Sequence, residues 1–317
     1  MDWYFWVLIA VAFILLATAA TAFVCFYMVF YSKGGRKPLD LDNFELPEGE
    51  IYEEFRGDMI EWVKELRTLA HEDITITSFD GLKLCGSYYE YKPGAITELL
   101  FHGYKGCAER DLSGGVERCF RLGRNALIIN QRASGPSEGR VISFGVNEHR
   151  DCLSWIDYAT KRFGKETKLV ITGVSMGAAT VMLTAGCDLP DNVVCVLADC
   201  GYTSQKEIIS KVIDEMKLPS KLLYPFVKLG ARIYGGFNLD EVTPIEAMKK
   251  CRLPIIFIHG DTDDFVPANM SQRLYDECVS DKKSLVFIKN AGHGLAFPRD
   301  RDGYVKALAD FEKEWLS

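Results

Sequence analysis

The chain has 317 residues, of which 48% are hydrophobic and 26% are charged. This length and composition suit one large α/β domain or two small ones, with ample apolar residues for a core. The net charge of −7 and the lack of a Lys/Arg cluster argue against nucleic acid as a partner.

An uncharged stretch of 29 residues runs from Trp3 to Tyr31. About 20 apolar residues in a helix cross the hydrocarbon core of a bilayer, and aromatic residues at both ends are typical of its interfaces. We therefore expect residues 1–32 to form a single-pass membrane anchor. The alternative is a cleaved signal peptide, because ATAATA at 17–22 resembles a cleavage site. The length of the stretch and the lack of a preceding basic residue argue against cleavage.

Basic residues follow the apolar stretch directly, at Lys33, Arg36 and Lys37. The positive-inside rule then predicts that the rest of the chain is cytoplasmic. Nine of the ten cysteines lie beyond the anchor, an odd number without a C-x-x-C pair. This usage favours reduced thiols in a reducing compartment.

Residues 33–70 are expected to form a linker and an amphipathic helix. The linker contains glycine and proline, and residues 50–69 then place apolar side chains at helical spacing. These apolar residues are Ile51, Phe55, Met59, Trp62, Val63, Leu66 and Leu69. Because the polar face mixes both charge signs, we expect the helix to lie on the following domain rather than on the membrane surface.

Residues 71–317 show short apolar runs separated by helical segments. A hairpin at 73–91 is expected to turn at Asp80-Gly81. Apolar runs follow at 97–103, 125–131, 168–174, 192–200, 253–260 and 283–294. Helical segments are expected at about 108–122, 148–163, 176–187, 245–250, 268–279 and 302–316. This alternation predicts an α/β domain with an eight-stranded, mostly parallel sheet and helices on both faces.

An amphipathic helical insertion interrupts the alternation at about 204–240. We expect it to lie above the sheet as a small helical lid. Its apolar residues are Leu222, Leu223, Tyr224, Phe226 and Val227. Together with the anchor, they favour a hydrophobic acyl substrate.

The pentapeptide Gly173-Val174-Ser175-Met176-Gly177 lies between a predicted strand and a predicted helix. This is the context of a nucleophile elbow, in which small residues must flank the serine because the turn is tight. Ser175 is therefore the candidate nucleophile, and Gly173 and Gly177 are the elbow glycines. The alternative is a glycine-rich turn that carries an incidental serine.

A nucleophilic serine needs a base, and the chain has five histidines, at 71, 102, 149, 259 and 293. The order Ser, acid, His selects His293, which lies in a glycine-flanked loop after the last strand. His259 ends its own strand, where a histidine more often bonds to the adjacent loop. His71 and His149 suit surface or helix-face positions.

The acid that orients the histidine is expected in the segment IHGDTDDFVP. We favour Asp263, because only two residues separate it from the end of the predicted strand at 253–260, and Val266-Pro267 follows it. Asp261 and Asp264 are alternatives that could instead cap the next helix. Asp199, at the end of another strand, could also face the site.

An oxyanion hole needs two preorganised backbone N–H groups. Met176 directly follows the nucleophile at the start of a helix and is expected to donate one. Gly103 follows a buried strand and would let the Tyr104 N–H turn toward the site. The alternative is that His102-Gly103 is a plain strand exit.

With Ser175, Asp263 and His293 in this order, residues from about 70 to 317 resemble the α/β-hydrolase fold. The resemblance is to prolyl-oligopeptidase-like serine hydrolases and small membrane-anchored esterases and thioesterases. It includes SFDGLKLCGSYY, LLFHGYKG, NQRASGPSEG, ITGVSMGAA, IHGDTDDFVP and AGHG. In the loop at 130–139, Asn130 replaces the acid of that branch and Ala133 replaces its first glycine. Asp151 and Trp155 also fit the branch and are expected to be architectural.

This resemblance implies a serine hydrolase that cleaves a small-molecule carboxylic ester or thioester through an acyl-enzyme. No cofactor is implied, and the lack of a metal-ligand motif in the sequence implies no metal. Acyl transfer and hydrolysis of small peptides would use the same residues. A different alternative is an inactive, membrane-tethered binding scaffold, which would have no need of all three side chains.

Overall fold

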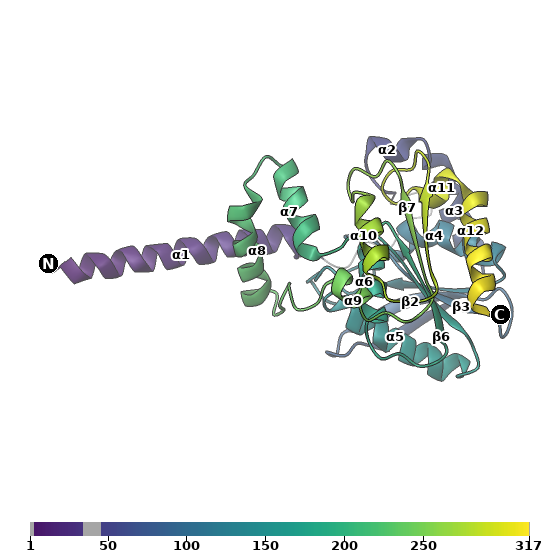
Figure 1. The fold of residues 1–317 in the computed structure, drawn as a ribbon. Coiled ribbons are helices and arrows are strands. Elements are labelled where there is room, and N and C mark those ends of the chain that lie inside the picture. Colours follow the sequence, from purple (N-terminus) through teal and green to yellow (C-terminus); the bar gives the residue numbers. More distant parts are fainter. Residues whose placement is uncertain (1–2, 34–45, 317) are drawn as a thin grey trace.

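The computed structural model describes residues 3–33 and 46–316 (Figure 1). Most of the predicted linker therefore lies outside the described residues. A long helix extends away from an α/β domain, and a shorter helix packs beside it (Figure 1).

The domain is built on an eight-stranded sheet in the order β1-β2-β4-β3-β5-β6-β7-β8. Strand β2 is antiparallel to both of its neighbours, and all other neighbours pair in parallel. The strands are β1 (Glu72–Thr77), β2 (Lys83–Tyr89), β3 (Thr97–Phe101), β4 (Asn125–Asn130), β5 (Leu169–Val174), β6 (Val193–Asp199), β7 (Ile255–Gly260) and β8 (Lys283–Ile288). The predicted α/β class and mostly parallel sheet are confirmed.

Helices cover both faces of the sheet. The part of the chain that the structure describes contains α1 (Trp3–Val29), α2 (Glu50–Glu53), α3 (Arg56–Thr68), α4 (Ala108–Arg121), α5 (Glu148–Phe163), α6 (Met176–Ala185), α7 (Gln205–Glu215), α8 (Ser220–Ile233), α9 (Pro244–Met248), α10 (Asn269–Glu277), α11 (Ala296–Arg299) and α12 (Arg301–Leu316). One core packs α5, α6, α9 and α10 against the sheet, and two further cores pack α3, α4, α11 and α12 against its other face. Strands β3 and β7 are buried along their whole length, as expected for parallel strands covered on both faces.

The amphipathic segment at 50–69 forms α2 and α3, and α3 lies on the domain. Its side chains Met59, Trp62, Val63 and Leu66 are buried. Trp62 stacks near Phe297, with ring centroids 5.6 Å apart. The apolar face that the sequence shows is thus covered by α4 and α11.

Helix α1 has an exposed half and a packed half. Residues 3–17 are exposed, whereas Ala22, Phe26 and Phe30 are buried. The ring of Phe30 contacts Phe144 and Phe237 edge to face, with centroids 5.9 and 5.3 Å away. The carboxyl end of α1 is therefore part of the domain core.

The insertion at 204–240 folds into α7 and α8; α8 lies beside α1, and α7 packs on α8 (Figure 1). Helix α8 approaches α1 closely at Gly230, where a Cβ atom would lie 2.4 Å from the carbonyl oxygen of Ala22. The Tyr234 hydroxyl donates to the carbonyl oxygen of Ala19 (3.1 Å). Much of the apolar face of the insertion is therefore used to pack against α1.

Candidate active site

Ser175 lies on a strained turn between β5 and α6. Its backbone has φ 57° and ψ −115°, a combination that residues other than glycine rarely adopt. A Cβ atom at Gly173 would lie 2.0 Å from the backbone of Gly177, and one at Gly177 would lie 2.0 Å from the carbonyl oxygen of Phe101. Both positions therefore require glycine, which explains the spacing of the pentapeptide.

The structure brings Ser175, His293 and Asp263 together at the carboxyl edge of the sheet. His293 Nε2 lies 2.9 Å from Ser175 Oγ, and His293 Nδ1 lies 2.7 Å from Asp263 Oδ2. Asp263 follows β7 and His293 follows β8, so each is carried by a loop at this edge. With its proton on Nδ1, the imidazole donates to the carboxylate and accepts from the serine hydroxyl.

Asp263 is held in its ionised form by several donors. The backbone N–H groups of Phe265 and Val266 donate to Oδ1 (3.0 and 2.8 Å). Burial raises the pKa of Asp263, but hydrogen bonds from His259 and His293 outweigh it and lower the pKa to about 2. A carboxylate in this state can stabilise a positive charge on His293.

The alternative residues lie elsewhere or serve other contacts. Asp261 and Asp264 are exposed, and Asp261 accepts from the Asn290 N–H (2.6 Å). Asp199 is buried, and its Oδ2 accepts from the Tyr304 hydroxyl (2.8 Å). His259 is also buried, with Nε2 3.1 Å from Asp263 Oδ2, so it contacts the acid rather than the serine.

The loop after β3 places Gly103 and Tyr104 beside Ser175. A Cβ atom at Gly103 would lie 3.6 Å from Ser175 Cβ. The Gly103 N–H donates to Asp111 Oδ2 (3.3 Å), and the Gln131 amide donates to the carbonyl oxygen of His102 (2.6 Å). Both bonds hold the peptide group that joins His102 to Gly103.

Two further features bear on the predicted oxyanion donors. Met176 is the first residue of α6, and the first N–H groups of a helix have no acceptor within the helix. The Tyr104 hydroxyl donates to the carbonyl oxygen of Val29 (2.6 Å) at the end of α1. Helix α1 is thus bonded directly to the loop that carries Tyr104.

A cavity of about 510 Å³ opens beside Ser175, His293, Gly103 and Tyr104. Residues 47–52 line it, and the Tyr52 hydroxyl donates to the carbonyl oxygen of His293 (3.1 Å). Among the residues that the structure describes, none of 204–240 lines this cavity. The segment around α2 therefore lines this cavity, whereas α8 packs on α1.

Sequence reasoning did not identify Tyr52, Gln131 or Asp111 as neighbours of the site, and it missed that His259 contacts the acid. His259 lies four residues before Asp263, a spacing that could have indicated this contact. Tyr52 gives no such signal, because its place depends on how α2 folds back over the sheet.

The loop at 130–139 contains Asn130 and Ala133, the two residues that depart from the pattern of the prolyl-oligopeptidase-like branch. Asn130 Oδ1 accepts from the Ala108 N–H (3.0 Å), and Ala133 adopts φ 60°, a conformation that suits glycine. Arg132 forms buried bonds to Asp151 (2.6 and 2.7 Å). This loop therefore has a structural role.

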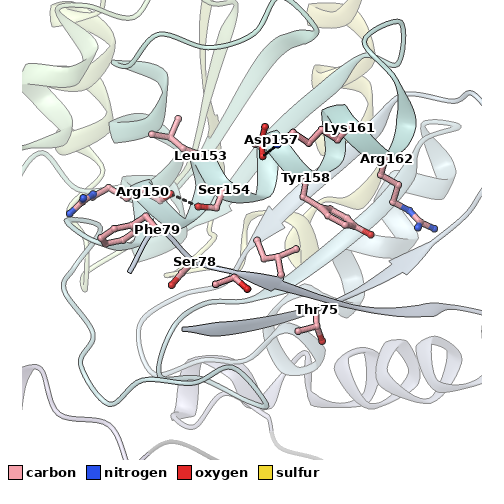
Figure 2. Close-up of a pocket in the computed structure, with 12 residues that line it drawn as sticks. Thr75, Ser78, Phe79, Arg150, Leu153, Ser154, Asp157, Tyr158, Lys161 and Arg162 are labelled. Atoms are coloured by element: carbon pink, nitrogen blue, oxygen red, sulfur yellow. Dashed lines mark hydrogen bonds and ion pairs between the residues drawn. The ribbon is translucent and has the colours of Figure 1, made fainter. Parts of the chain in front are cut away.

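A larger hollow of about 820 Å³ lies along the sheet edge, between β1 and α5 (Figure 2). The Arg150 guanidinium stacks over the Phe79 ring at 3.6 Å, and Lys161 pairs with Asp157 (2.7 Å). Neither Ser175 nor His293 lines this hollow. It is a shallow groove away from the nucleophile.

One group of described residues could share a cation, because ligand atoms of Cys200, Asp263 and His293 lie within 4.8 Å of one another. Asp263 and His293 are already hydrogen-bonded to each other. Burial raises the pKa of the Cys200 thiol well above its ordinary value, which disfavours the thiolate that a metal binds. The arrangement suits acid–base chemistry better than metal binding.

Comparison with known proteins identifies the family. Residues 143–317 match the prolyl oligopeptidase family. The chain is 30% identical to YqkD of Bacillus subtilis over 191 residues, which are 60% of this chain and 62% of that protein. It is 28% identical to protein bem46 of Schizosaccharomyces pombe over 255 residues, 79% of this chain and 76% of that protein.

The fold is shared with solved esterases. The Pyrococcus furiosus esterase Pf2001 superposes with a TM-score of 0.65 at 21% identity, covering 90% of this chain and all of the esterase. This likeness confirms the expected α/β-hydrolase fold. The family match covers Ser175, Asp263 and His293, and the chain belongs to the prolyl oligopeptidase family of α/β hydrolases.

Proposed function

We propose that the chain is a serine hydrolase that cleaves a carboxylic ester or thioester of a small molecule. Ser175 is the nucleophile, His293 the general base and acid, and Asp263 the residue that orients His293. The observation that carries the proposal is the continuous pair of contacts, 2.9 Å from Ser175 Oγ to Nε2 and 2.7 Å from Nδ1 to Asp263.

In the first half-reaction, His293 Nε2 takes the proton of Ser175 Oγ while Oγ bonds to the acyl carbon. The carbonyl oxygen becomes an oxyanion, held by the N–H groups of Tyr104 and Met176. His293 then gives its proton to the leaving oxygen or sulfur as that bond breaks. In the second half-reaction, water attacks the acyl carbon and loses its proton to His293. The bond between the acyl carbon and Ser175 Oγ then breaks, His293 returns the proton to Oγ, and the acid is released.

Labelling with a fluorophosphonate tests this proposal. The folded chain should be labelled at Ser175, and Ser175→Ala should abolish both labelling and ester hydrolysis. Ser154→Ala is the matched control, because Ser154 is a half-buried serine on α5, away from the site, whose hydroxyl donates to the carbonyl oxygen of Arg150 (3.2 Å). A folded wild type that resists the probe would favour the binding scaffold instead. Acyl transfer would be recognised by a product in which an added alcohol replaces water.

We further propose that residues 1–32 anchor the protein in a membrane, with the catalytic domain of residues 71–317 on the cytoplasmic side. Helix α1 is 27 residues long, apolar and uncharged, which is enough to cross the hydrocarbon core of a bilayer. The basic residues Lys33, Arg36 and Lys37 support the orientation. Retention of α1 is supported by the burial of Ala22, since cleavage within 17–22 would cut into a segment that packs on α8.

A further inference from the structure

The cavity beside Ser175 has an exposed mouth and a buried inner end. At the mouth, Ile51 and Phe265 are 51% and 43% exposed. At the inner end, Arg118, Asp199 and Tyr304 are at most 4% exposed, and all three line the cavity. Arg118 lies on α4, Asp199 on β6 and Tyr304 on α12. The inner end therefore lies between the sheet and the helices α4 and α12 that cover this face.

Two polar atoms at this inner end have no hydrogen-bond partner among the described residues, Asp199 Oδ1 and Arg118 Nε. The other oxygen of Asp199 accepts from the Tyr304 hydroxyl (2.8 Å), and Arg118 Nη2 bonds to Glu98. Buried polar atoms are nearly always hydrogen-bonded, because leaving one unpaired is costly. The residues at the inner end of the cavity therefore carry one acceptor and one donor that lack a partner among the described residues.

The charges at the inner end limit what that molecule can be. Glu98 pairs with Arg118 and with Arg124, and Arg124 also pairs with Glu312 (2.8 Å), so these four charges balance. Asp199 is thus the additional acidic group. Burial raises its pKa, and the hydrogen bond from Tyr304 opposes this shift.

A substrate carboxylate would be repelled by an ionised Asp199. A plain hydrocarbon would cover Asp199 Oδ1 and Arg118 Nε without pairing either. A neutral hydroxyl or amide group both donates and accepts hydrogen bonds. It can therefore pair with Asp199 Oδ1 and with Arg118 Nε, whether Asp199 is ionised or protonated.

The direction of proton transfer decides which part of the substrate lies inside. His293 must reach the leaving group, and its ring lies 4.9 Å from the exposed Phe265 ring at the mouth. The leaving group therefore lies at the mouth, and the acyl group extends inward. Leu100, Leu112 and Trp62 line the cavity along the way and suit an apolar stem.

We propose that the inner end of the cavity is an acyl-group subsite for a neutral hydroxyl or amide, recognised by Asp199 and Arg118. The inference rests on the proposed serine hydrolase function and deepens it. It refines the hydrophobic acyl substrate expected from the sequence to an acyl chain with an apolar stem and a polar end.

Matched nitrophenyl esters test the subsite. Thr172, another lining residue, lies three positions before Ser175 on β5. At ~3.3 Å per residue, the distance along β5 from Ser175 to Thr172 is about 10 Å. An acyl chain bound to Ser175 needs about six to eight carbons to span that distance. Each chain is compared with and without a terminal hydroxyl. The wild type should prefer the hydroxylated ester by about 10-fold or more in kcat/KM.

Variants assign the preference to Asp199. Asp199→Leu should bring the ratio of the two kcat/KM values close to one, whereas Asp199→Asn, which keeps both shape and hydrogen bonding, should retain the preference. The matched control is Asn192→Leu, which removes another buried polar side chain just before β6, at its opposite end. It should leave the ratio unchanged. Fluorophosphonate labelling reports whether each variant is folded and has a competent nucleophile.

The outcomes separate this inference from the proposed function. A wild type that is labelled but hydrolyses the unsubstituted ester equally well or better overturns the subsite and leaves the serine hydrolase standing. An Asp199→Leu variant that is labelled and keeps the full preference also overturns it. If the wild type is neither labelled nor active on either ester, the proposed function fails and the inference fails with it.

Discussion

Asp263 receives hydrogen bonds from two histidines and two backbone N–H groups, and this environment has a consequence for acid stability. Its pKa in the folded protein is about 2, below its ordinary value of 3.8. The stabilisation is therefore complete above about pH 5 and is lost as the pH falls through about 4 to 2. The shift corresponds to about 2 kcal/mol.

We predict that Asp263→Asn destabilises the chain near neutral pH and that the difference from wild type shrinks toward pH ~2. The free energy of unfolding, measured by denaturant titration at several pH values, checks this. A difference that does not change with pH would show that these hydrogen bonds do not depend on ionised Asp263. Turnover by the variant should also fall strongly, because His293 loses its orienting partner.

At the residue scale, chain order and turn chemistry were enough to select Ser175, Asp263 and His293, which the structure brings within hydrogen-bonding distance. A strand–turn–helix with glycines leaves little freedom at the serine, and parallel strands bring their following loops to one edge. Tyr52 and the contact of His259 with Asp263 could not be selected in this way. The four-residue spacing of His259 and Asp263 is compatible with their contact, but chain order does not select it, and the position of Tyr52 depends on how α2 folds back over the sheet.

At the element scale, α1 is bonded to the loop that carries Tyr104. The Tyr104 hydroxyl donates to Val29, and Lys105 Nζ donates to the carbonyl oxygen of Met28 (3.3 Å). We predict that Tyr104→Phe, which keeps the backbone N–H but loses this bond, lowers kcat by about 3- to 10-fold with little change in KM. Tyr31→Phe is the control, since the Tyr31 hydroxyl bonds to Arg140 instead (3.3 Å). Equal kcat values for Tyr104→Phe and wild type would contradict the positioning role.

The packing of α8 on α1 gives a second prediction at this scale. Gly230→Ala places a Cβ atom 2.4 Å from the Ala22 carbonyl oxygen, so the two helices must separate. We expect a loss of about 1–3 kcal/mol in the free energy of unfolding. Gly57→Ala in α3 meets no atom within 4 Å and should be neutral or slightly stabilising. Thermal unfolding in detergent compares the two.

The element boundaries themselves were largely predictable from periodicity. The expected helices at 108–122 and 148–163, for example, appear as Ala108–Arg121 and Glu148–Phe163. The partner of the insertion was not predictable. An amphipathic helix shows that it has an apolar face, but its sequence does not say which surface covers that face.

At the scale of the whole molecule, α1 and the domain form one folded unit in the described residues. The N–H of Ile142 donates to the carbonyl oxygen of Phe30 (2.8 Å), and the N–H of Ser32 donates to that of Arg140 (2.9 Å). We predict that the protein extracted from membranes keeps its N-terminal segment, with an intact mass near 35.7 kDa. A shorter product that begins after residues 17–22 would contradict retention of the anchor.

The sequence by itself determined the α/β class, the strand and helix order, and the three residues that lie at one edge of the sheet. Local periodicity and turn geometry depend on residues that are close together in the sequence, so no tertiary information was needed to predict them. Only the tertiary structure decided that α2 covers the cavity, that α8 packs on α1, and that Asp199 and Arg118 meet at the inner end. Each of these depends on which apolar faces bury one another, and many pairings satisfy the same pattern until the whole chain is packed.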